Sequence, residues 1–152
     1  NLQQKMSKSV QQNKCYTQKL SIKCKNEFEL LNISYAVQKA LDKSKILEGF
    51  VNVNAMDTTC SCFINDDESG LHSDFKLFLD NNVKYYVDVN GNKKEMKYKN
   101  NKSISHIKRQ LFGRAVMVAV SKGKLDFGNW EQIFFACFDG KSNSGTKTVL
   151  IK

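Results

Sequence analysis

The alternation of apolar and polar side chains predicts strands along much of the chain. Residues 49–55 (GFVNVNA) alternate position by position, which is the pattern of a strand with one buried face. Residues 59–64 (TCSCFI) are rich in side chains that favour strands and are predicted to form its partner. Further strands are predicted at residues 15–24, 27–31, 115–120, 124–127, 133–138 and 146–151.

Apolar residues that recur three and four positions apart predict three helices. The first covers about 33–41, and Asn32 can cap it. The second covers about 71–81 and follows an acidic segment whose carboxylates suit the positive start of a helix. The third covers about 103–112. The side chains predicted to face inward on the second and third helices are Leu71, Phe75, Phe78, Leu79, Ile104, Ile107, Leu111 and Phe112.

The order of these elements predicts the fold class. Between the second and third helices, Asn90-Gly91 at the centre of 84–98 is a strong hairpin signal. Strands, a helix, strands, helices and strands in this order predict an α+β fold with mostly antiparallel sheets. A length of 152 residues suits one domain. We therefore expect a polar N-terminal arm at 1–13 and a single domain over 14–152.

Composition and cysteine use predict where the protein works. No apolar run approaches the roughly 20 residues of a membrane span, so we expect no membrane partner. Residues 1–13 are polar and carry lysines without an apolar core, unlike a signal peptide. The five cysteines are an odd number, which favours reduced thiols and a cytoplasmic location.

Two of the cysteines, Cys60 and Cys62, form a Cys-x-Cys pair on a predicted strand. A zinc site usually takes four ligands from two such pairs, and the sequence has no second pair. The pattern therefore favours buried, apolar thiols over a metal site.

The formal net charge of +9 attracts anions such as phosphorylated ligands or nucleic acid. Nucleic-acid modules usually add a recognisable signature or aromatic residues among the basic ones, and neither is evident here. The charge is therefore more typical of a solvated, lysine-rich surface, and nucleic acid is not an expected partner.

Motifs by themselves indicate no enzyme class. The two histidines are His72 and His106, and each is more typical of a surface or hydrogen-bonded histidine than of a ligand. The sequence contains no nucleophile elbow, no glycine-rich phosphate loop and no His-Glu-x-x-His motif.

Four stretches in order nevertheless resemble the YjbQ-like family, which is associated with a secondary thiamine-phosphate synthase activity. They are 48–66 (a strand, a turn ending in Thr-Thr, a strand and then Asn-Asp), 74–79, 101–113 and 118–140. The last contains a Gly-Lys-Leu-Asp-Phe-Gly-Asn-Trp run and ends in Asp-Gly.

The resemblance implies a homotrimer whose sheets pack around a three-fold axis. It also implies a metal-binding pocket lined by the turn before the second strand and by a histidine-bearing helix. The positions that match the family pattern are Thr58, Thr59, Asn65, His106, Gly128, Trp130, Asp139 and Gly140.

Several positions depart from the family pattern. Asp57 stands where the family has the turn histidine, and Asp66 stands where it has a glutamate. A second family histidine has no counterpart in residues 98–100, so two of three expected histidines are absent. Cys137 replaces a strand glutamate, and two arginines appear as lysines, one of them Lys147.

The resemblance thus implies a site and leaves two functions open. The implied catalytic residues are His106, Asp57 and Asp66, and the metal ligands would be His106 and Asp57. The implied ligand-binding residues are Thr58, Thr59, Asn65 and Trp130. An aspartate ligand favours a hard divalent ion such as Mg²⁺ or Mn²⁺. The chain is then either a non-catalytic trimeric binding protein, which the missing histidines favour, or a metal-assisted enzyme acting on a phosphorylated small molecule.

Overall fold

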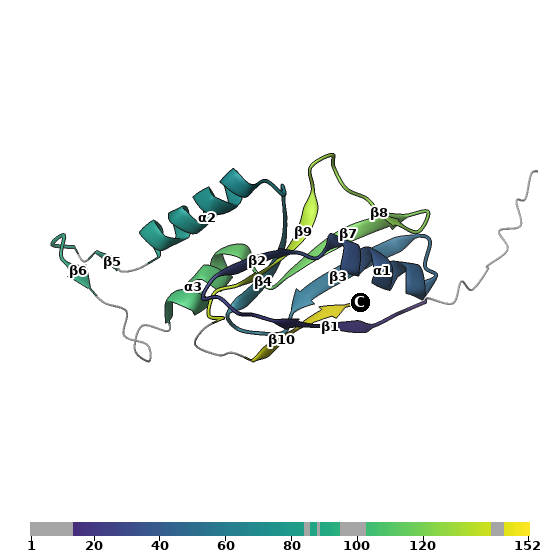
Figure 1. Cartoon of the computed structure of the whole chain (residues 1–152), viewed down its shortest axis with the longest axis horizontal. Helices are drawn as coiled ribbons and strands as arrows, with labels where there is room; N and C mark the ends of the chain where they lie inside the picture. Colours follow the sequence, from purple (N-terminus) through teal and green to yellow (C-terminus); the bar gives the residue numbers. More distant parts are fainter. Residues whose placement is uncertain (1–13, 84–85, 88, 95–102, 141–144) are drawn as a thin grey trace, which may run out of the picture.

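The computed structural model describes residues 14–83, 86–87, 89–94, 103–140 and 145–152 (Figure 1). The predicted arm at 1–13 and residues 98–100 lie outside them. The elements are β1 (Gln18–Lys23), β2 (Glu29–Asn32), α1 (Ser34–Ser44), β3 (Gly49–Ala55), β4 (Cys60–Asn65), α2 (Ser69–Asn82), β5 (Tyr86–Val87), β6 (Lys93–Lys94), α3 (Ser103–Phe112), β7 (Ala115–Ser121), β8 (Lys124–Leu125), β9 (Gln132–Cys137) and β10 (Thr146–Ile151).

The described strands form antiparallel sheets, which confirms the predicted α+β class. A five-stranded sheet has the order β1-β10-β3-β7-β8, and a three-stranded sheet has the order β2-β9-β4. The predicted hairpin is present as the β5-β6 pair, with Val87 opposite Lys93. β7 turns into β8 through Lys122 and Gly123, both with positive φ, which is the backbone that a tight hairpin requires.

Strand β9 lies in the middle layer of the molecule, which explains its unbroken apolar sequence. Ile133, Phe135 and Cys137 belong to the core shared with the five-stranded sheet and α1. Ala136 and Phe138 belong to a second core shared with α2 and α3. Both faces of β9 are therefore buried, and a strand covered on both faces has no polar alternation.

The helices α2 and α3 cover the outer face of the three-stranded sheet through aromatic side chains, and Figure 1 shows them on the same side of the molecule. Phe75 and Phe112 lie 4.8 Å apart between ring centroids and both approach Phe63 of β4. The predicted inward position of Phe78 is wrong, because its side chain is 58% exposed. Leu111 is likewise 57% exposed, although the bounds of α3 agree with the prediction.

The start of α1 differs from the prediction by one residue. Asn32 remains in β2, opposite Phe134 of β9, so Ile33 takes the capping position. The Asn32 side chain still accepts a hydrogen bond from the Ser34 backbone N–H at 3.0 Å, while its amide donates to Asp67 at 2.7 Å.

Within the described residues, every helix is too short or too polar to cross a membrane.

Candidate functional site

A buried ion cluster lies where the two larger sheets meet, at the end of β9. Lys147 of β10 donates from Nζ to Asp57 Oδ2 at 3.0 Å and lies 3.1 Å from Asp139 Oδ1. Its side chain is only 4% exposed, against 29% for Asp57 and 10% for Asp139. A lysine is almost never this buried without a carboxylate partner, so the two aspartates account for its place in the core.

Asp57 is held on both carboxylate oxygens by its own chain. Its Oδ1 accepts hydrogen bonds from the Thr59 backbone N–H at 2.8 Å and from the Thr59 hydroxyl at 2.6 Å. Burial alone would raise the pKa of Asp57, but the hydrogen bonds from Thr59 and Lys147 outweigh it and lower that pKa. The carboxyl group is therefore ionised at neutral pH.

The charge of Lys147 is stabilised in the same way. Burial would lower the pKa of Lys147, but its hydrogen bonds to Asp57 and Asp139 outweigh burial and raise that pKa. Lys147 therefore stays protonated inside the core at neutral pH.

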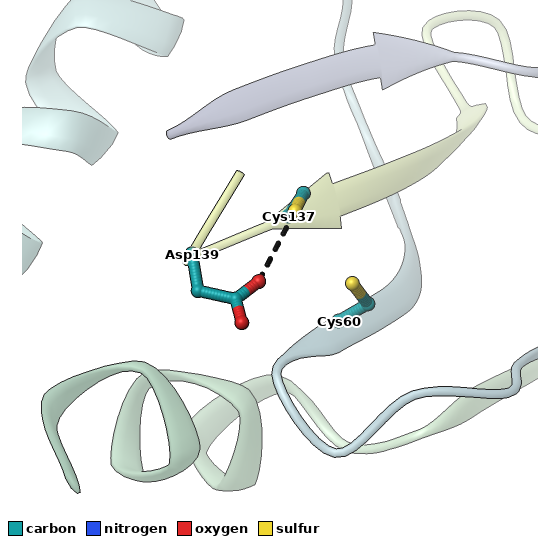
Figure 2. A group of neighbouring side chains, drawn as sticks. All are labelled: Cys60, Cys137 and Asp139. Atoms are coloured by element: carbon teal, nitrogen blue, oxygen red, sulfur yellow. Dashed lines mark hydrogen bonds between the residues drawn. The ribbon is translucent and has the colours of Figure 1, made fainter. Parts of the chain in front are cut away.

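Three thiols adjoin the ion cluster. Cys60 of β4 lies directly opposite Cys137 of β9, and both are fully buried. Cys137 Sγ lies 3.6 Å from Asp139 Oδ1, and Figure 2 shows the Cys60 sulfur and the Asp139 carboxylate facing the end of β9 that carries Cys137. Cys24, which follows β1, is also buried, and Cys137 contributes to raising its pKa.

The three thiols differ in acidity because they share hydrogen bonds. Hydrogen bonds from Cys60, from the Asp139 backbone N–H and from Cys24 lower the pKa of Cys137 to about 7, against the opposing effect of burial. The pKa of Cys60 is raised by its hydrogen bond to Cys137 and by burial. Burial and the hydrogen bond to Cys137 raise the pKa of Cys24.

Gly140 fixes the position of Asp139 through a close backbone approach. The Gly140 N–H donates to the Glu27 carbonyl oxygen at 3.2 Å. A Cβ atom at Gly140 would collide with the Asn26 carbonyl group and lie 3.1 Å from Cys24 Cβ. Only glycine fits there, which gives the Asp-Gly pair of the sequence a packing reason.

The structure separates the predicted site residues into groups at the two ends of β4. Asp57, Thr58 and Thr59 precede this strand, whereas Asn65 ends it and Asp66 follows. The six residues of β4 span roughly 17–20 Å, so one ion within a single chain cannot bind both Asp57 and Asp66.

The remaining predicted residues lie on the surface. Thr58 is exposed, and Trp130 is 75% exposed in the loop before β9. His106 of α3 lines an open surface hollow of about 440 Å³ together with Ser103, Ile107, Gln110 and Leu111. The ligand atoms of the described chain that lie close enough to hold one ion belong to Cys60, Cys137 and Asp139, and not to His106 or Asp57.

Sequence reasoning missed the role of Lys147, although a signal was present. Lys147 shares its face of β10 with Val149 and Ile151, the two positions that the alternation assigns to the core. A lysine at a strand position that the alternation assigns to the buried face indicates a buried ion pair. The sequence does not show which acids complete the pair, because Asp57 lies 90 residues away.

Comparison with known proteins gives consistent matches over nearly the whole chain. The family model "UPF0047 protein YjbQ-like" matches residues 18–152. A UPF0047 protein of Methanothermobacter thermautotrophicus is 34% identical over 84% of this chain and 86% of its own length. One from Archaeoglobus fulgidus is 30% identical over 88% of this chain and 97% of its own length.

Solved structures share the fold. An uncharacterised conserved protein of the YjbQ/UPF0047 family from Clostridium acetobutylicum superimposes with a TM-score of 0.77 at 27% identity. The match covers 88% of this chain and 97% of that one. A YbjQ-like protein of unknown function from Sulfolobus solfataricus gives the same TM-score at 21% identity. This match covers 90% of this chain and 94% of that one, and it shows a similar fold.

Proposed function

We propose that this chain, which belongs to the YjbQ-like UPF0047 family, is a homotrimeric, non-catalytic binding protein for a small phosphorylated molecule. The proposal includes the loss of the thiamine-phosphate synthase activity associated with the family. The observation that carries it is the state of Asp57, the residue that replaces the turn histidine of the family.

The contacts of Asp57 argue against a catalytic role. A general base at neutral pH needs a pKa near 7, whereas the contacts of Asp57 lower its pKa below the ordinary value of 3.8. A metal ion at Asp57 would compete with the two hydrogen bonds that Oδ1 accepts from Thr59 and with the one that Oδ2 accepts from Lys147. Asp57 therefore takes the place of the histidine without supplying its chemistry.

The ligand class follows from the N-terminal end of α3. The start of a ten-residue helix carries partial positive charge, which favours an anion. Ser103 and His106 line the surface hollow there. Ser103 Oγ is shielded from solvent and has no hydrogen-bond partner in the part of the chain that the structure describes. A phosphate oxygen would satisfy this hydroxyl.

A trimer is supported by the outer face of the five-stranded sheet. Phe50 of β3 and Met117 of β7 project from this face and are 69% and 65% exposed. On the same face, Asn54 Oδ1 is shielded and has no hydrogen-bond partner among the described residues. A face with two large exposed apolar side chains and an unsatisfied acceptor suits burial against further copies of the chain.

The test measures binding and synthesis in the same preparation. Calorimetric titration with thiamine phosphate and with inorganic phosphate should show binding that His106→Ala and Ser103→Ala weaken. His72→Ala is the matched control, because His72 of α2 lies 3.4 Å from Asp67, which precedes that helix, and is outside the lining of the hollow. No thiamine-phosphate synthesis should be detected with Mg²⁺, Mn²⁺ or Zn²⁺ present.

Two results would overturn the proposal. Phosphate binding that is equal in wild type, His106→Ala and Ser103→Ala would remove the assigned ligand site. Synthesis by the wild-type protein that His106→Ala abolishes would favour the metal-assisted enzyme instead. The variant Asp57→His tests the lost histidine directly, since restored synthesis would show that this one position switched the activity off.

A further inference from the structure

We infer that Cys60, Cys137 and Asp139 form a buried site for a thiophilic divalent metal ion, with zinc as the expected ion. Cys60 begins β4, Cys137 ends β9, and Asp139 lies two residues after β9. One ligand atom from each lies within 4.8 Å of the others (Figure 2). This site goes beyond the proposed ligand binding on α3 and does not depend on it.

Strand register brings the two thiols together. The Phe138 N–H donates to the Thr59 carbonyl oxygen at 3.1 Å, so these two residues face each other as a hydrogen-bonded pair. In an antiparallel ladder the next pair, Cys60 and Cys137, is then a non-hydrogen-bonded pair, in which side chains approach most closely. The sheet itself therefore holds the two sulfur atoms in reach of one ion.

The distances suit tetrahedral coordination. Zinc binds sulfur at about 2.3 Å and carboxylate oxygen at about 2.0 Å, which gives a sulfur–oxygen edge of roughly 3.5 Å. Cys137 Sγ and Asp139 Oδ1 are already 3.6 Å apart. Two sulfur atoms bound to one tetrahedral zinc ion are roughly 3.8 Å apart. All pairs of ligand atoms here lie within 4.8 Å, so the two sulfur atoms need to approach each other by less than a bond length.

The donor set selects the metal. Two thiolates and one carboxylate favour Zn²⁺ over Mg²⁺ or Mn²⁺, which take oxygen ligands. The three side chains supply three ligands, and a water molecule would take the fourth position of a tetrahedral zinc ion. Cys60 and Cys62 are both buried, as the Cys-x-Cys pattern predicted, but the thiol that Cys60 meets in this site is Cys137 on another strand.

The neighbouring ion pair is compatible with a bound cation. Lys147 contacts both Asp139 and Asp57. Its hydrogen bond to Asp57 would remain if Asp139 turned an oxygen toward the metal. A buried lysine thus retains a carboxylate partner in both arrangements. Because Cys60 and Cys137 are completely buried, the ion enters as the chain folds.

Cobalt substitution tests the site directly. The protein is unfolded under reducing conditions, freed of metal with a chelator and refolded with one equivalent of Co²⁺. We expect a thiolate-to-cobalt charge-transfer band with the visible bands of tetrahedral Co²⁺, and displacement of the cobalt by Zn²⁺. Protein refolded with Zn²⁺ should contain one zinc per chain and unfold at a higher temperature than protein refolded with a chelator.

Single variants separate this site from other metal binding. Cys60→Ser, Cys137→Ser and Asp139→Asn should each lose at least tenfold in affinity for Co²⁺, and the two serine variants should weaken the charge-transfer band. Cys62→Ser is the matched control, since Cys62 lies on the same strand and is equally buried but does not belong to the group. Its cobalt spectrum should equal that of the wild type.

The inference fails if wild-type protein shows no charge-transfer band, a readout that requires no variant to fold. It also fails if the band survives in Cys60→Ser and Cys137→Ser, or if mass spectrometry finds these two cysteines joined as a disulfide in freshly isolated protein. Phosphate binding at His106 is measured separately, so loss of either site is distinguishable from loss of the other.

Discussion

The ammonium group of Lys147 lies 3.0 Å from the carboxylate of Asp57, although 90 residues separate them in the chain. Lys147 belongs to the five-stranded sheet, and Asp57 occupies the turn through which the chain passes from β3 into the three-stranded sheet. The pair therefore joins the two sheets at one end of their shared core.

Removing Lys147 should destabilise the protein strongly. Lys147→Met keeps the length of the side chain but leaves Asp57 and Asp139 without their shared cation. Breaking a buried ion pair from one side costs about 3–5 kcal/mol of the free energy of unfolding. Urea denaturation monitored by circular dichroism measures this loss. Lys19→Met on the neighbouring strand β1 is the control, because Lys19 is exposed and its loss should change stability by less than about 0.5 kcal/mol.

The contribution of Asp57 should depend on pH in one direction. Its pKa is lower in the folded protein than the ordinary value of 3.8, so its stabilisation is fully present above about pH 4. That stabilisation is lost as the pH falls through the lower folded value. We expect Asp57→Asn to cost about 1.5–3 kcal/mol at pH 7, the worth of hydrogen bonds to a charged group, and less below pH 4.

The measurement compares unfolding free energies of wild type and Asp57→Asn between pH 2.5 and pH 8 (roughly the range set by carboxylate titration). In metal-free protein, the groups that face Asp57 are Lys147, which stays charged throughout, and the Cys60 thiol, whose raised pKa keeps it neutral. Asp74→Asn on the exposed face of α2 serves as control. A difference between wild type and Asp57→Asn that stays constant down to pH 2.5 would contradict the prediction.

Much of the fold could be predicted from local patterns. The bounds of β3, β10 and α3 agree with the prediction, because alternation and helical spacing are set by neighbouring residues. The exposure of Phe78 and Leu111 could not be predicted, because a helical stripe shows which residues share a face and not how far the sheet beneath extends.

The site was predictable only in part. The resemblance marked Asp57, Cys137 and Lys147 as departures from the family pattern, each considered alone. Their meeting depends on the antiparallel register of β4 with β9 and on the packing of one sheet against the other. A single sequence contains neither register nor sheet packing, so the ion cluster and its thiols emerged only from the structure.

Gly140 should tolerate no side chain. A Cβ atom there would meet the Asn26 carbonyl group, which is backbone and cannot turn away. Gly140→Ala should therefore cost about 3 kcal/mol in the free energy of unfolding, the upper range for overpacking. In Gly128→Ala, by contrast, the atoms nearest to the new methyl group belong to the flexible Glu131 side chain, at 3.4 Å. Urea denaturation of both variants tests the difference, and equal stability of the two would show that the Asn26 backbone yields.

In the proposed trimer, the outer face of the five-stranded sheet should form the interface. In Phe50→Asp, a carboxylate would enter this face opposite Ala119 and would have to lose its hydration in the assembly. Static light scattering should give three times the chain mass of 17.4 kDa for wild type and a lower mass for the variant. Tyr35→Asp is the matched control, because Tyr35 is 78% exposed on α1, away from this face, and its loss should leave the mass unchanged. A monomeric wild type, or a trimer that survives Phe50→Asp and Met117→Asp together, would show that this face is not the interface.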